Sequence, residues 1–378
     1  MTRPRRLPPL VAVVAMITAL LGACSNGHDV EAGTETTSRD GRFPAAVVST
    51  TTPNTTPFGV AASNATTSTT AKPSTGTTAP GATTTTTGPA GRTKPAATPL
   101  PEARAGVAGA AWQGLVVVAG GVGPGGGYSV RVDAYDPKSG QWTRGPNLPV
   151  ALRDAAMGVL GDDLWVAGGL AIENGQPVAQ SQTYLFHPGG TSWQDGPSLH
   201  TPRSGAAAAV AGNFLVVLGG EQSDGTILDS VEVLAKGASD WKVTQAMSIP
   251  RAYSAALAMG GRIYAAAGRN PGAPAVNSVE SWRSGSGWRT ESHLDKERVY
   301  PGGAGNCVAG GENSGGVVSS IECYSTGFWA TIGQMSVPRY QLAAIVLDGW
   351  LHLIGGATAS SLATNTHEVI DVSAVPAS

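Results

Sequence analysis

The sequence predicts an all-β domain in which six similar repeats pack in a ring. An apolar segment followed by a glycine pair recurs, and the first glycines at 120, 168, 219, 268, 310 and 355 stand 42 to 51 residues apart. A period in this range is typical of a repeat architecture. The 52 Gly and 26 Pro among 378 residues, with only 13% charged residues, also indicate short strands and turns rather than helices.

The first 23 residues have the pattern of an export signal. Arg3, Arg5 and Arg6 precede an apolar run over residues 10–21, which ends in Leu21-Gly22-Ala23-Cys24. This tetrapeptide resembles a bacterial lipobox. The resemblance implies that Cys24 is lipidated, becomes the mature N-terminus and anchors the protein in the membrane through several acyl chains. The alternative is an ordinary secretory signal with a chance cysteine.

Residues 24–90 are predicted to form a disordered stalk. They are a low-complexity tract of Thr, Ser, Pro, Ala and Gly with too few large apolar residues to offset the entropy of ordering. Such Ser/Thr-rich tracts with Pro are also typical of O-glycosylated stalks. The tract would carry the following domain away from the membrane.

Each repeat over residues 91–378 contains more than its glycine pair. An Arg, a run of small apolar residues and a turn precede the pair, and a third alternating segment, a turn and a Trp follow it. Four short strands cannot bury a core alone, but blades stacked radially can. The pattern resembles the Kelch family of β-propellers, which implies six four-stranded blades. The repeat tryptophans are Trp142, Trp193, Trp241, Trp288 and Trp329.

Three of the repeats depart from the pattern. Blade four has Gly268-Arg269 in place of a glycine pair, and blade five is shortened between Arg298 and Gly310. The sixth repeat lacks its Trp segment, so its fourth strand must come from elsewhere. Residues 91–99 align with the strand-four exits of other repeats and are expected to form the outer strand of the last blade, which would remove an open edge.

Residues that recur in every repeat are interpreted as structural. The repeated arginines could pair with acidic residues that follow the glycine pairs by 12 or 13 positions. The acidic residues are Glu232, Glu280, Glu322 and Glu368. The arginines are Arg104, Arg153, Arg203, Arg251, Arg298 and Arg339.

Cys307 and Cys323 are predicted to be directly opposed in one hairpin, because the midpoint between them falls in the turn at Gly315. Opposed residues of a non-hydrogen-bonded pair can form a disulfide, and export would place them in an oxidising compartment. Two buried free thiols are the alternative.

The candidate ligand-binding residues are those that differ between repeats on one face. In a four-stranded blade, the loop after strand two and the loop into the next blade's strand one share a face. Charged and aromatic residues converge there on blades three to six: Glu221, Tyr253, Arg269, Tyr300, Glu312 and Tyr340. A solvated surface with no ligand is the alternative interpretation.

The resemblance leaves three classes of function open. A net charge of −2 offers no basic face for nucleic acid, and no cofactor or metal site is expected because the five histidines of the repeats are scattered. The favoured hypothesis is a non-catalytic scaffold lipoprotein of the cell envelope that binds a protein or a cell-wall glycan. An extracytoplasmic carbohydrate-active enzyme resembling a sugar epimerase is the alternative. A copper oxidase of the galactose-oxidase type is the least favoured.

Overall fold

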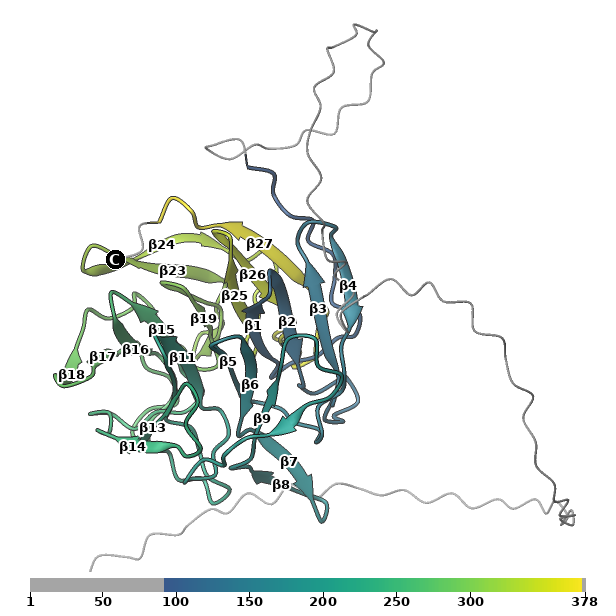
Figure 1. Cartoon of the computed structure of the whole chain (residues 1–378). Coiled ribbons are helices and arrows are strands. Elements are labelled where there is room, and N and C mark those ends of the chain that lie inside the picture. The colour runs from purple at the N-terminus through teal and green to yellow at the C-terminus, as the bar shows by residue number, and fades with distance from the viewer. Residues whose placement is uncertain (1–91, 376–378) are drawn as a thin grey trace, which may run out of the picture. The chain divides into compact units, whose positions relative to one another are not determined.

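A computed structural model describes residues 92–375 of the chain. The predicted signal peptide over residues 1–23, the lipidation site Cys24 and the stalk over residues 24–90 lie outside this range. Within it, six antiparallel sheets surround a common axis as the blades of a propeller (Figure 1). None of the described residues forms a helix that is long and apolar enough to cross a membrane.

Blades one to three are four-stranded, and a two-stranded hairpin projects from blade two. Blade one consists of β1 (Ala108–Trp112), β2 (Leu115–Ala119), β3 (Val132–Asp136) and β4 (Gln141–Arg144). Blade two consists of β5 (Ala156–Leu160), β6 (Asp163–Ala167), β9 (Thr183–Phe186) and β10 (Gln194–Asp195), with the hairpin β7 (Leu170–Glu173) and β8 (Gln176–Ala179). Blade three consists of β11 (Ala207–Ala211), β12 (Phe214–Leu218), β13 (Val231–Ala235) and β14 (Lys242–Thr244).

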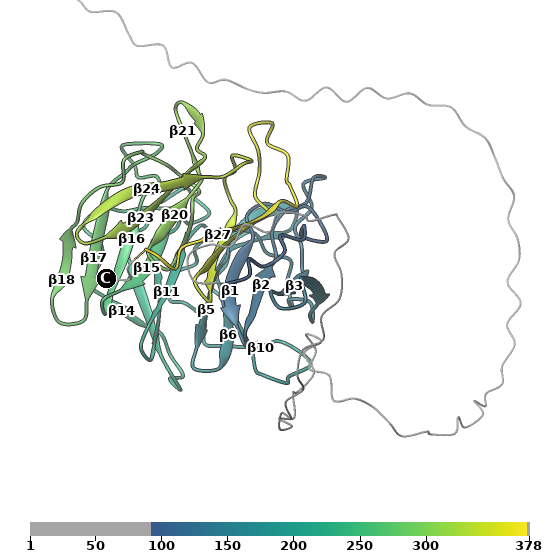
Figure 2. The same cartoon turned by 90° about the horizontal axis from the view of Figure 1, so that it is seen from above.

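Blades four and five are also four-stranded, whereas blade six has three strands. Blade four consists of β15 (Ala255–Met259), β16 (Arg262–Ala266), β17 (Val279–Arg283) and β18 (Gly287–Thr290). Blade five consists of β19 (Gly302–Ala304), β20 (Cys307–Ala309), β23 (Ser320–Ser325) and β24 (Phe328–Gln334), with the hairpin β21 (Glu312–Asn313) and β22 (Gly316–Val317), which projects from the body (Figure 2). Blade six consists of β25 (Ala343–Leu347), β26 (Trp350–Ile354) and β27 (His367–Asp371).

The first strand of each blade lines the axis. β1, β5, β11, β15, β19 and β25 contact one another in turn, and β25 returns to β1, so the first and last blades lie side by side (Figure 1). The second strands are almost fully buried, which agrees with their continuous apolar sequences. The strand-four tryptophans join neighbouring blades, because the indole N–H of Trp193 donates to the carbonyl of Pro146 and that of Trp241 donates to the carbonyl of Pro197.

Buried ion pairs between an arginine and an acidic residue stabilise five of the six blades, and we call these arginines the stitching arginines. Arg251 is representative: Nη2 lies 3.0 Å from Glu280, and Nη1 donates to the carbonyl of Ala267 at 2.8 Å. The other oxygen of Glu280 accepts the backbone N–H of Ser248, which belongs to the preceding blade. The observed pairs are Arg104–Asp133, Arg203–Glu232, Arg251–Glu280, Arg298–Glu322 and Arg339–Glu368. The predicted pairing of the repeated arginines with acidic residues is thus observed, and Asp133 extends it to blade one.

Arg153 does not belong to this set, so its interpretation as a structural arginine is wrong. The stitching arginine stands 16 residues before the first residue of the glycine pair in blades one, three, four and six. At that spacing blade two has Leu152, which is fully buried. Arg153 is displaced by one position, pairs with Asp154 and has its guanidinium 5.8 Å from the ring centroid of Tyr128.

This spacing also corrects the assignment of the glycine pair in blade four. Ala267 takes the place of the first glycine with a φ of 62°, and Gly268 takes the place of the second with a φ of 94°. The carbonyl of Ala267 accepts the hydrogen bond of Arg251, as Gly120 does from Arg104. Arg269 therefore follows the pair, in the same place as Glu221 of blade three.

The segment over residues 92–100 lies across the seam between blades six and one. The carbonyl of Thr98 accepts hydrogen bonds from Trp142 Nε1 and His367 Nδ1, both at 2.9 Å. The guanidinium of Arg92 lies 5.1 Å from the ring centroid of Trp350. The segment therefore covers the edge of the last blade and connects it to the first.

This segment is not a strand, so the prediction of an outer strand over residues 91–99 is wrong as to its secondary structure. Pro95 and Pro99 have no backbone N–H and cannot donate to a ladder. The segment instead uses carbonyl groups, and Leu100 donates to the carbonyl of Asn365 at 2.9 Å. Closure relies on side-chain donors from the two blades rather than on sheet pairing.

Cys307 and Cys323 are directly opposed on β20 and β23 and are joined by a disulfide with a Cα–Cα distance of 4.0 Å. Both residues are buried beside Ile321 and Leu351. The disulfide braces blade five, whose first two strands have only three residues each.

Candidate functional site

The six chain segments that enter the first strands form a closed ring of backbone hydrogen bonds around the axis. At one position in each blade, the N–H donates to the carbonyl of the equivalent residue in the preceding blade, with N···O distances of 2.7 to 3.0 Å. The ring residues are Gly106, Asp154, Gly205, Tyr253, Tyr300 and Gln341. We call this ring, together with the residues next to it in sequence, such as Arg153, Ser254 and Tyr340, and the residues directly after the glycine pairs, the mouth.

All six ring residues have left-handed backbone angles, with φ between 53° and 63°. Glycine adopts this conformation freely, whereas other residues are disfavoured by about 1 kcal/mol each. Four of the left-handed ring positions nevertheless carry residues other than glycine, namely Asp154, Tyr253, Tyr300 and Gln341. Strained positions that carry polar or aromatic side chains are concentrated at functional sites, so the ring favours a binding role for the mouth.

Glycines in the ring make room for their neighbours. A Cβ atom on Gly106 would lie 2.6 Å from Oδ1 of Asp154, and one on Gly205 would overlap the ring of Tyr253. The side chains of Asp154 and Tyr253 thus lean over the preceding blades. Between them remains a central cavity of about 100 Å³ that Tyr300 and Ser254 also line.

Three tyrosines form a continuous row along one side of the mouth. The ring centroids of Tyr253 and Tyr300 are 4.4 Å apart, and those of Tyr300 and Tyr340 are 6.0 Å apart. Burial raises the pKa of both Tyr253 and Tyr300, and the nearby carboxylate of Asp154 raises it further. The phenols are therefore neutral hydrogen-bonding groups at physiological pH.

Two arginines at the mouth are already paired with carboxylates. Arg269 forms an ion pair with Glu221, and its guanidinium lies 5.6 Å from the ring centroid of Tyr253. The hydrogen bond that Arg269 donates to Glu221 raises the pKa of Arg269. Arg153 Nε donates to Asp154 at 2.7 Å, and burial raises the pKa of Asp154 despite this partner.

Several polar groups at the mouth lack a partner. Within residues 92–375, neither the buried Oγ of Ser254 nor Nε of Arg269 has a hydrogen-bond partner. Glu312 forms no ion pair in the same range, and burial raises the pKa of its carboxyl. Buried polar groups in proteins are nearly always satisfied, so these atoms are suited to a ligand or to ordered water.

The structure brings most of the predicted ligand-binding residues together. Glu221, Tyr253, Arg269, Tyr300 and Tyr340 form a chain of contacts, and Glu312 lies at the base of the β21–β22 hairpin, near enough to influence the pKa of Tyr300. Asp154 and Arg153 belong to this site but were not among the predicted ligand-binding residues. The 16-residue spacing between the stitching arginine and the glycine pair could have identified Arg153, because it shows that Leu152 takes the structural position in blade two.

The arrangement can recognise a ligand but has no evident nucleophile activated by a base. No histidine lines the central cavity, and no group of three or more His, Cys, Asp or Glu side chains within residues 92–375 could hold a metal ion. Both cysteines of the described range are joined in the disulfide, which leaves no thiol there for a tyrosine–cysteine crosslink.

Comparison with known proteins agrees with this architecture. Residues 103–149 match the family model of the Kelch motif. The fold is a six-bladed Kelch-type β-propeller. A solved structure, titled "Structure of YjhT", has a TM-score of 0.65 with 16% sequence identity and covers 73% of this chain and 97% of that chain.

Curated relatives cover only part of the propeller. Kelch-like protein 35 of Mus musculus is 30% identical over 143 residues, which are 38% of this chain and 23% of that protein. Kelch-like protein 41a of Danio rerio is 24% identical over 207 residues, which are 52% of this chain and 34% of that protein. The aligned part is less than half of either relative, so the similarity concerns the Kelch repeats.

Proposed function

We propose that this protein is a non-catalytic scaffold of the cell envelope whose propeller binds a segment of another protein at the mouth. The observation that carries the proposal is the mouth itself, where four strained non-glycine residues surround a cavity that is also lined by Ser254, whose Oγ has no partner within residues 92–375. Tyrosine and arginine are enriched among the side chains that anchor protein partners. The similarity to Kelch-like proteins supports a binding module of this kind.

The location outside the cytoplasmic membrane is part of the proposal. It rests on the lipobox-like sequence that ends at Cys24, and the disulfide between Cys307 and Cys323 supports it because disulfides persist mainly in oxidising compartments. Mass spectrometry of the mature protein tests it. A diacylated N-terminal Cys24 and processing blocked by globomycin are expected, whereas a mature N-terminus elsewhere would refute the lipid anchor.

Capture experiments with the full-length protein in detergent test the binding site. Envelope extracts passed over immobilised wild-type protein should yield a partner that Tyr340→Ala loses and Phe328→Ala retains, because Phe328 is exposed and lies at the β23–β24 turn, away from the mouth. Equal capture by both variants would place the interaction outside the mouth.

A carbohydrate-active enzyme is a second candidate, favoured by Glu312. A carboxyl whose pKa is raised by burial, beside tyrosines that can stack on a sugar, is the kind of group that serves as a general acid. Screening cell-wall sugars for turnover tests this candidate. Activity that Glu312→Gln abolishes would establish an enzyme, and its absence would leave the binding module.

A further inference from the structure

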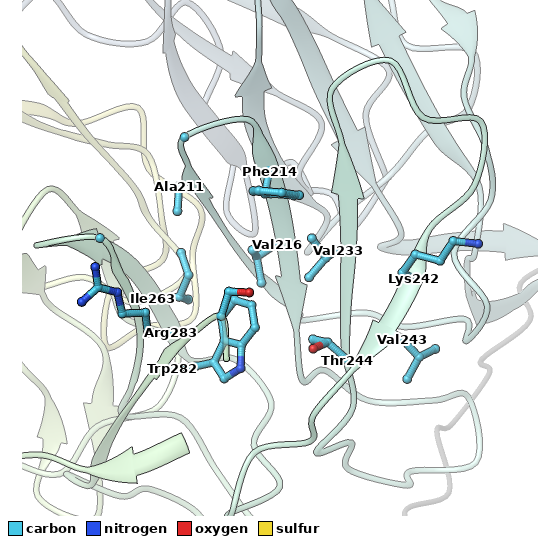
Figure 3. A pocket seen from close by; sticks show the side chains of 13 residues that line it. Ala211, Phe214, Val216, Val233, Lys242, Val243, Thr244, Ile263, Trp282 and Arg283 are labelled. Carbon is cyan, nitrogen blue, oxygen red and sulfur yellow. The ribbon is translucent and has the colours of Figure 1, made fainter. Parts of the chain in front are cut away.

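A second cavity lies between blades three and four, at the strand ends remote from the mouth. It has a volume of about 490 Å³, and its floor is apolar. Phe214 is 48% exposed and Val243 is 60% exposed at its edges. Trp282 lies in the middle of the view, with Arg283 and Lys242 on opposite sides of the opening (Figure 3).

The equivalent seam between blades one and two is filled by Trp112. This side chain is the last residue of β1, is 4% exposed and packs edge-on against Phe186 with ring centroids 5.7 Å apart. Its indole N–H donates to the carbonyl of Asp162 at 2.6 Å. One tryptophan thus closes the gap between two blades.

Strand register shows that the cavity is the same socket without its tryptophan. Trp112 pairs with the first residue of β2, and Ala211 pairs with the first residue of β12, so Ala211 stands where Trp112 stands. Blades two and four have the larger buried residues Leu160 and Met259 at this position. The walls also correspond, residue by residue. Val216, Val233, Gly261, Ile263 and Trp282 take the places of Val117, Ala134, Asp162, Leu164 and Phe186.

We propose that this cavity is a docking socket for a tryptophan side chain of a partner protein, presented beside an acidic residue. The shape of the cavity supports this proposal, because the indole of Trp112 fills the space between the equivalent walls of blades one and two. The carbonyl of Gly261 takes the place of that of Asp162, so an inserted indole has an acceptor for its N–H. Contiguous exposed apolar surface of this kind marks interaction sites.

The charges at the opening of the cavity determine which kind of partner residue can lie next to the inserted tryptophan. No carboxylate lines the cavity, and Arg283 forms no ion pair within residues 92–375. Lys242 is partly neutralised by Asp240 at 2.7 Å. An acidic group next to the indole would therefore complement Arg283, whereas a basic group would be repelled.

The occupant comes from another molecule. All nine tryptophans of the chain lie between positions 112 and 350, within the blades, and residues 1–91 contain neither Trp nor Tyr. The socket is also separate from the mouth, so it is a second binding surface that does not depend on the proposed function of the first.

Two small probes with the same ring and opposite charge test the socket. Saturation-transfer NMR with full-length protein in detergent should detect indole-3-acetate, and tryptamine should bind about threefold more weakly because of Arg283. Arg283→Gln should remove the difference. Tyr340→Ala at the mouth should leave both signals unchanged. Absence of an indole-3-acetate signal, or equal binding of the two probes by the wild type, would overturn the proposal.

The decisive variant fills the socket with a tryptophan side chain of the protein itself. Ala211→Trp should fold with an unchanged or higher Tm and lose the indole-3-acetate signal by at least about fivefold. Val243→Glu, at an exposed position, should fold normally and abolish the preference for indole-3-acetate, because its carboxylate offsets the charge of Arg283, so it tests the socket even if Ala211→Trp does not fold. An indole-3-acetate signal retained by Ala211→Trp, together with an unchanged preference in Val243→Glu, would refute the site. A wild-type dimer that Ala211→Trp or Val243→Glu dissociates would show that a second copy is the occupant.

Discussion

The stitching arginines and the ring residues of the mouth lie two positions apart in five of the six repeats, yet they behave in opposite ways. At the first position five blades have the same residue with the same partners, as with Arg251 and Glu280. At the second position the blades have Gly, Asp, Gly, Tyr, Tyr and Gln on a shared backbone conformation. Repetition therefore identifies residues that hold the blades together, whereas variation on a constant backbone identifies residues available to a ligand.

Removing one of the buried arginine–acid ion pairs should have the largest effect on stability. Glu280→Gln leaves the guanidinium of Arg251 buried without a counter-charge and weakens the acceptor of Ser248, so a loss of about 3–5 kcal/mol in the free energy of unfolding is expected. Urea denaturation measures it. Glu221→Gln, at the half-buried mouth pair, is the matched control and should cost about 1 kcal/mol or less. Equal losses would remove the distinction between the two positions.

Reducing the disulfide should have the next largest effect. The bridge closes a loop with a sequence separation of 16, for which chain entropy predicts about 3 kcal/mol. Thermal unfolding of the Cys307→Ala/Cys323→Ala variant should show this loss, while the mouth retains its ligand. A variant as stable as the wild type would mean that blade five is held by its Arg298–Glu322 stitch alone.

Acidification should weaken the seam between blades six and one. Burial lowers the pKa of His352 to about 3 and that of His367 to about 4, against about 6.5 in the unfolded chain. Because the folded values are lowered, this stability is fully present above pH 6.5 and is lost as pH falls toward 3. At pH 5 the loss is about 2 kcal/mol per histidine. Unfolding of His352→Gln/His367→Gln should depend less on pH between 7 and 5, and an identical dependence would contradict this assignment.

Exchanging a mouth residue for the glycine that other blades have at the same position should have the smallest effect on stability. Tyr300→Gly reproduces the ring residue of blades one and three, and relief of the left-handed strain, about 1 kcal/mol, offsets part of the lost contact with Tyr253. Calorimetry should show a change in stability well below that of Glu280→Gln. A comparable loss would mean that Tyr300 holds the fold.

The fold could be predicted from the sequence because its signals are periodic and local. Glycine pairs, strand-four tryptophans and the spacing of Arg251 from Glu280 report directly on blade geometry. The closing segment was misjudged because Pro95 and Pro99 permit alignment with a strand but not ladder hydrogen bonding. Arg153 was misassigned because residue type was followed rather than spacing.

The mouth was only partly predictable, for physical reasons. Loop residues such as Tyr253 and Arg269 stood out because they differ between repeats. Asp154 did not, because its importance depends on the space that Gly106 leaves, which is a three-dimensional property. The socket at Ala211 is defined by a missing side chain and becomes visible only when strand register shows that Ala211 takes the position of Trp112.

The most direct test of the central claim compares Tyr300→Gly with Glu280→Gln in one experiment. Full-length proteins in detergent are assayed together for unfolding free energy and for capture of the envelope partner retained by the wild type, at a temperature where each variant is folded. We predict that Tyr300→Gly loses the partner with nearly unchanged stability, while Glu280→Gln loses stability and keeps the partner. Partner binding that follows stability in both variants would contradict the assignment of function to the mouth.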